Sequence, residues 1–158
     1  MAEVVATDTS FVGHDPINVL LLAFGGLIAT AVVGVYSLVR ATDNGFGGCR
    51  GTTAGLRTAG SAALGGAIAV YTWGLLHLVV LDATAQAKAC RDALGGAELL
   101  AYEPSYLPLA FGCVAADGGT HDVIVPGYVS PVAGLLGGGA LLLAALSFGE
   151  AYRQKADA

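Results

Sequence analysis

Charged side chains are scarce in this sequence, and their scarcity limits the classes of protein to which it can belong. Only 12% of its 158 residues are Asp, Glu, Lys or Arg, whereas a soluble domain carries about 25%. The chain has 7 basic and 12 acidic residues, for a formal net charge of −5. A nucleic-acid partner requires a basic surface, so we expect none. Residues 1–16 contain no Lys or Arg, so we also expect no secretory signal peptide.

Recognisable catalytic motifs are also missing. The glycine-rich stretch 47–53 lacks the Lys-Ser/Thr ending of a phosphate-binding loop. No serine lies in a nucleophile-elbow motif, and no pair of carboxylates has a spacing that predicts glycoside hydrolysis. Polar residues are few in the middle of the apolar segments, which argues against a transport pathway. We therefore expect neither an enzyme nor a transporter. We also expect that the chain has no cofactor of its own and that it contacts lipid.

Long apolar runs stand where charge is missing. Three of them, at about 17–39, 57–81 and 129–152, each have about the 20 residues that a helix needs to cross a bilayer. The chain also contains 24 glycines, a residue more frequent in transmembrane helices than in soluble ones. We expect an all-α integral membrane protein with one domain of three transmembrane helices, and with 82–128 as a loop module outside the membrane.

The basic residues are unevenly distributed along the chain. Only Lys88 and Arg91 lie in the loop 82–128, and the others lie between the first two apolar runs or after the third: Arg40, Arg50, Arg57, Arg153 and Lys155. The positive-inside rule then places the N-terminus and the loop outside and the C-terminus in the cytoplasm. The abundance of Ala, Gly and Val is compatible with a high-GC bacterium, so we expect a multi-pass protein of the inner or plasma membrane.

The three cysteines are also divided between the proposed outer and cytoplasmic regions. Cys90 and Cys113 lie in the outer loop, and Cys49 lies between the first two apolar runs. An oxidising exterior permits disulfides and the cytosol usually does not. We expect a Cys90–Cys113 bridge and a free Cys49; the alternative is two buried thiols.

The loop module has sequence signals for both helix and strand. Strong helix formers continue past the second apolar run, which predicts one helix over about 57–94 with a protruding extension. The stretches 107–114 and 120–125 flank an Asp-Gly-Gly turn and predict a β-hairpin. Asp15 and Pro16 form a helix-start signature before the first span.

Small residues recur at helical spacing within all three apolar runs. In lipid, such residues allow helix backbones to approach closely. A three-helix bundle could bury these stripes internally, but the run 137–139 has more glycine than one interface requires, which suggests a second protein or mobility. The expected helix-packing residues are Gly26, Gly34, Ser61, Gly65, Ala69, Gly134 and Gly138.

Two further groups are candidates for binding. His14, His77 and His121 are weak candidates for a zinc or copper site, because their spacing matches no motif and packing explains them as well. The loop is rich in aromatic residues that can form a docking patch for other membrane subunits: Tyr102, Tyr106, Phe111 and Tyr128.

These features favour an accessory subunit of a larger bacterial membrane protein complex, plausibly a respiratory or other membrane oxidoreductase assembly. Its helices and outer loop would stabilise contacts between subunits. The alternative is a stand-alone or homo-oligomeric membrane protein that binds a ligand or metal through the loop. Convergence of the three histidines would favour that alternative.

Overall fold

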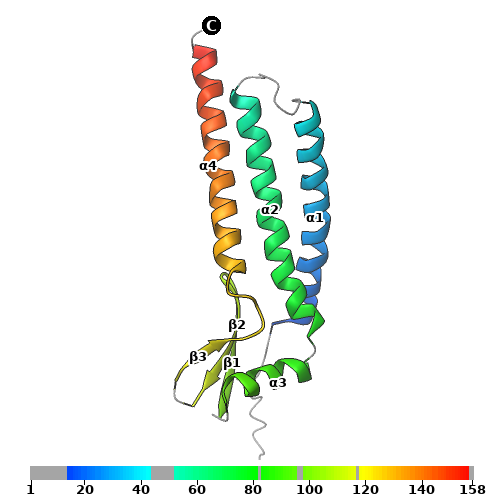
Figure 1. Cartoon of the computed structure of the whole chain (residues 1–158), viewed down its shortest axis with the longest axis vertical. Helices are drawn as coiled ribbons and strands as arrows, with labels where there is room; N and C mark the ends of the chain where they lie inside the picture. The colour runs from blue at the N-terminus through cyan, green and yellow to red at the C-terminus, as the bar shows by residue number, and fades with distance from the viewer. Residues whose placement is uncertain (1–13, 44–51, 82, 96–97, 117, 157–158) are drawn as a thin grey trace, which may run out of the picture.

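Three long helices stand side by side, and a small sheet with one short helix lies at one end of them (Figure 1). The computed structural model describes residues 14–43, 52–81, 83–95, 98–116 and 118–156. In chain order the elements are α1 (Pro16–Asp43), α2 (Thr52–Val80), α3 (Ala83–Ala93), β1 (Leu99–Tyr106), β2 (Leu109–Ala115), β3 (Thr120–Asp122) and α4 (Val129–Ala156).

The three long helices are α1, α2 and α4, with 28, 29 and 28 residues. Each is long and apolar enough to cross a membrane, as the hydropathy of the sequence predicts. The expected start of the first helix is present, because helix α1 begins at Pro16 and the Asp15 carboxylate accepts a 2.9 Å hydrogen bond from the Ile17 amide. This bond satisfies one of the amides that a helix start leaves unpaired.

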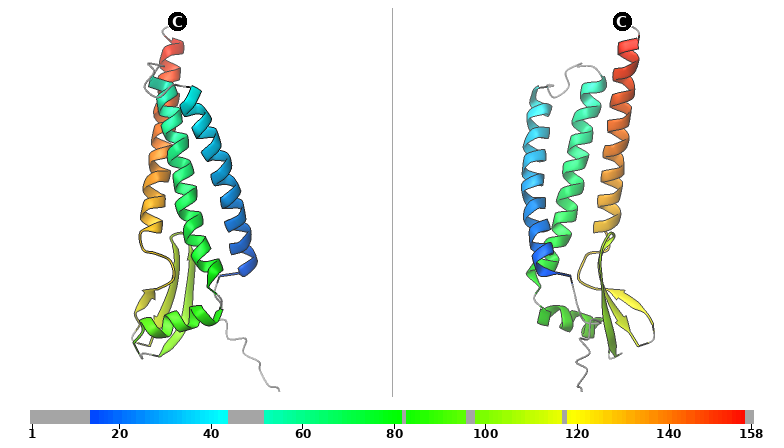
Figure 2. Two further views of the ribbon diagram at one scale, coloured as in Figure 1. Left: turned by 45° about the vertical axis from the view of Figure 1, so that its right-hand side comes forward. Right: turned by 180° about the vertical axis from the view of Figure 1, so that it is seen from behind.

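Helix α2 lies between the other two, so the helices form a row and not a closed bundle (Figure 2). The extensive helix contacts are those of α1 with α2 and of α2 with α4. Within the most apolar window of each helix, 28% of the residues are buried for α2 but only 11% for α1 and for α4. The row therefore leaves much of the two outer helices uncovered by protein.

The sheet has three antiparallel strands in the order β1-β2-β3. The predicted hairpin corresponds to β2 and β3, in which Gly112 pairs with Asp122. Strand β1 was not predicted, so the hairpin expectation and the all-α description are both too narrow. Pro104 obscures this strand in the sequence, but a proline is tolerated in β1 because β1 is an edge strand.

The predicted continuous helix over 57–94 is wrong, because α2 ends at Val80 and α3 begins at Ala83. Helix α3 lies crosswise to α2 (Figure 1). The Gln86 side chain donates a 3.0 Å hydrogen bond to the Leu81 carbonyl next to the break. The change of direction lets α3 bury Cys90 against the sheet, whereas a straight extension would expose its apolar face to solvent.

Several contacts fasten the sheet to the long helices. The Tyr71 hydroxyl of α2 donates a 2.7 Å hydrogen bond to the Tyr106 carbonyl of β1. A Cβ at Gly74 would lie 2.7 Å from a Leu109 methyl and 2.8 Å from a Val129 methyl. A larger residue would force these side chains to shift, so α2 packs closely against β2 and the start of α4, and this packing joins the two parts of the molecule.

Candidate functional site

The disulfide ties α3 to the central strand of the sheet. Cys90 and Cys113 are bonded, their Cα atoms are 5.7 Å apart, and both side chains are fully buried. The bridge predicted from the sequence is thus present. Cys49, predicted to be free, lies outside the described residues.

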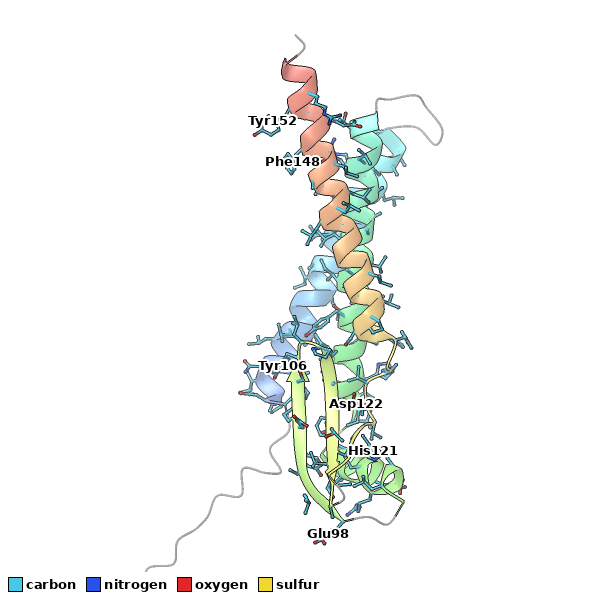
Figure 3. All side chains as sticks on the ribbon, turned by 90° about the vertical axis from the view of Figure 1, so that its left-hand side faces the viewer. Glu98, Tyr106, His121, Asp122, Phe148 and Tyr152 are labelled. Carbon is cyan, nitrogen blue, oxygen red and sulfur yellow. A yellow bond between two sulfur atoms is a disulfide. The ribbon has the colours of Figure 1, made fainter. Side chains whose placement is uncertain are left out.

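The three histidines lie in separate environments. The His14 Nε2 atom is 3.0 Å from the Ser105 carbonyl, and the His77 Nδ1 atom is 2.9 Å from the carbonyl of Trp73 in its own helix. His121 is exposed on β3, toward the free end of the sheet (Figure 3). Among the described residues, no three His, Cys, Asp or Glu side chains gather into a group that could hold a metal ion. The convergence that would favour a metal-binding protein is not found there.

The aromatic residues of the module divide into a buried and an exposed set. Phe111 is only 1% exposed, and the Tyr102 ring packs 5.3 Å from it. Tyr106 packs edge-on against the His14 ring at 4.6 Å. Tyr128, in contrast, is 54% exposed. Phe111 therefore forms the core of the module, and of the four predicted docking residues Tyr128 presents the most surface to a partner.

Two other apolar side chains of the same module are exposed. Leu107, in the turn between β1 and β2, is 88% exposed, and Leu100, on β1, is 49% exposed. The sequence analysis missed Leu100, because strand β1 was not predicted. An alternation of apolar residues on a third strand would have been the signal.

Three of the predicted helix-packing residues lie where α1 meets α2. A Cβ at Gly26 would overlap the Thr72 side chain, and one at Gly65 would lie 3.2 Å from a Val33 methyl. The Ser61 hydroxyl accepts a 3.0 Å hydrogen bond from Ser37. These short contacts show close approach of the two helices. Ala69, on α2, is half-buried.

The remaining predicted packing residues face open space. A Cβ added at Gly34, Gly134 or Gly138 would meet no atom within 4 Å. On α4, the residues that contact α2 include Leu136 and Ala140. At 100° per residue, Gly134 and Gly138 lie on the opposite side of the helix.

The outer face of α4 is therefore uncovered, and its small residues, all exposed, are called the outer stripe: Gly134, Gly138, Ala145 and Gly149. Leu141, which is 75% exposed, lies on the same side of the helix between Gly138 and Ala145. Large apolar side chains border it, among them Leu142, which is 61% exposed. In lipid, a stripe of this kind allows a second helix to pack at short range.

The basic helix ends lie at the end of the row that is remote from the sheet. Arg40 is in the last turn of α1, and Arg57 is near the start of α2. Lys88 and Arg91 are on α3, beside the sheet at the other end (Figure 1). If the row crosses a bilayer, the sheet and Arg40 lie on opposite sides of it.

Comparison with known protein families, with curated proteins and with solved structures finds no match to this chain. Its chemistry must therefore be inferred from its own geometry. That geometry comprises uncovered helix faces and a disulfide-tied module among the described residues.

Proposed function

We propose that this chain spans a bacterial cell membrane and acts as an accessory subunit of a larger membrane protein complex, with its N-terminus and sheet outside and its C-terminus in the cytoplasm. The observation that carries the proposal is the outer stripe on α4, which no part of the described chain covers. An uncovered helix face with small residues four apart allows close packing of a neighbouring helix.

The outward module supports the same role. It is fastened to α2 by the Tyr71 hydrogen bond and internally by the disulfide. Tyr128 and Leu107 are exposed on it, so a partner that packs on the outer stripe could also contact the module. Such a combined contact would fix the orientation of a neighbouring subunit. A respiratory or other oxidoreductase assembly is the kind of complex that we propose.

The test is purification of the tagged chain from its own host in mild detergent, with identification of the chains that accompany it. We expect a distinct second protein, and a haem or flavin absorbance in the purified complex would identify an oxidoreductase. Replacing Gly134 and Gly138 with leucine should reduce recovery of the partner about tenfold, because overpacking an interface costs about 1–3 kcal/mol.

The matched control is Gly137→Leu. Gly137 is the neighbour of Gly138 and also has open space at its Cβ position, but it lies on the side of α4 that faces a groove beside α2. This variant should retain the partner. Recovery of the wild-type chain as a monomer, or only as a homo-oligomer, would contradict the proposal, and so would full retention by the double variant.

A further inference from the structure

The end of the row remote from the sheet contains a small polar pocket between α1 and α2. Its volume is about 110 Å³, and it is lined by Tyr36, Arg40, Thr53, Ala54, Arg57 and Thr58. The Arg40 guanidinium lies 5.3 Å above the centre of the Tyr36 ring. Two guanidinium groups and several hydroxyls thus border one site, and guanidinium groups favour phosphate as a ligand.

The pocket has two arginines, and the nearest acidic residue in the sequence is Asp43, in the last turn of α1. Both arginines are exposed. The sequence that connects the two helices, 44–51, contains no Asp or Glu. Thr53 and Ala54 belong to the first turn of α2, where the helix dipole also favours an anion. Two arginines against one carboxylate leave a net positive charge at this end of the two helices, which favours a negatively charged ligand.

An apolar groove adjoins the pocket and shares Tyr36 and Arg57 with it. The groove has a volume of about 530 Å³ and runs between α2 and α4, past Gly60, Leu64, Gly137, Leu141 and Phe148. From Phe148 to Gly137 it follows α4 for about 16 Å, at the 1.5 Å rise per residue of a helix. That length matches half of the roughly 30 Å hydrocarbon core, which is the depth of one leaflet.

We propose that the pocket and the groove together bind one anionic glycerophospholipid of the bilayer. Its phosphate would lie between Arg40 and Arg57, and one acyl chain would lie in the groove against Gly60 and Gly137. A free phosphate would leave the groove unfilled, and a zwitterionic lipid would bring a positive group to two arginines. Basic pockets between transmembrane helices on the cytoplasmic side are typical sites for anionic headgroups.

This inference requires that the chain spans a membrane, but it does not require a partner subunit. The groove and the outer stripe meet at Leu141, but Gly137 in the groove and Gly138 in the stripe lie about 100° apart around α4. Substitutions at these two glycines therefore alter the two surfaces separately. Failure to recover a second protein would leave lipid binding unaffected.

The test is binding of defined lipids to the purified full-length chain in a non-ionic detergent, measured by native mass spectrometry. Phosphatidylglycerol, phosphatidylcholine with the same acyl chains, and glycerol 3-phosphate serve as the three ligands. We expect phosphatidylglycerol to bind best and its binding to weaken with salt. The double variant R40Q/R57Q should bind it about 30-fold more weakly, and the lipid preference should disappear.

Two controls separate the headgroup site from the acyl groove. Arg153→Gln removes an exposed charge from the end of α4, outside the residues that line the pocket, and should leave affinity unchanged within about twofold, as is usual for surface changes. Gly137→Leu fills the groove and should weaken the binding of phosphatidylglycerol. Gly138→Leu, on the outer stripe, should leave that binding unchanged. Equal binding of the two lipids, wild-type affinity in R40Q/R57Q, or binding of glycerol 3-phosphate as tight as that of the lipid would overturn the proposal.

Discussion

Replacing Phe111 with alanine is expected to destabilise the module outside the helix row by about 3–5 kcal/mol, the range for a fully buried phenylalanine. The Phe111 side chain is 1% exposed and lies among Cys90, Cys113 and Leu109 in the core. Its removal leaves a cavity that the rigid disulfide region cannot easily fill. Amide hydrogen exchange of β2 measures the loss directly, because β2 is the central strand.

Leu107→Ala is the control for this experiment, because Leu107 is an apolar residue of the same module that is 88% exposed. It should change stability by no more than about 0.5 kcal/mol. Wild-type exchange rates in the Phe111 variant would show that this side chain does not hold the sheet together. Phe111 would then again be a candidate for a docking residue.

Loss of the disulfide is the other large effect that we expect. The bridge closes a chain segment with a sequence separation of 23, and the chain-entropy treatment gives about 3 kcal/mol for a loop of this size. The double variant C90A/C113A avoids an unpaired thiol. It should increase hydrogen exchange in α3 and in the sheet, while α1 and the distal half of α2 keep their protection.

Reduction of the wild-type protein provides an independent form of the same experiment. Dithiothreitol under mildly denaturing conditions should reproduce the exchange pattern of the double variant. Unchanged exchange of α3 in both preparations would mean that packing alone holds this helix on the sheet. The bridge also bears on location, because disulfides persist in oxidising compartments.

The long helices could be predicted because their length and mean hydropathy are those of segments that can cross a bilayer. The Asp15–Pro16 start and the Cys90–Cys113 bridge followed from local chemistry and from the distribution of basic residues. Each of these predictions uses residues that are close in sequence, the hydropathy of a segment, or the distribution of charge along the chain. A single sequence contains all of this information.

The direction of α3 could not be predicted in the same way. Helix propensity predicts that residues 83–93 are helical. The change of direction after α2, however, depends on packing against a sheet whose strands follow α3 in the sequence. Asp82 is a residue type favoured before a helix start and was the available signal. Strand β1 was missed because it contains Glu103 and Pro104, two residue types that are uncommon in strands.

The placement of the small residues also required the structure. Periodicity assigns Gly65 and Gly138 equally to helix contacts, yet the first meets Val33 and the second meets open space. Which stripe is used internally depends on the order of the helices in the row. The Arg40–Arg57 pocket was missed for the same reason, because its two arginines come together only when α1 and α2 pair.

The central claim is that the helix row crosses a membrane, with the sheet and the basic helix ends on opposite sides. It is tested most directly by labelling single cysteines with a membrane-impermeant thiol reagent, in a Cys49→Ser background that keeps the disulfide. Asp122→Cys, on the exposed β3 strand, should react in intact cells, and Arg153→Cys, near the end of α4, should react only after the membrane is permeabilised. Labelling of both positions in intact cells, or of neither before permeabilisation, would contradict the account.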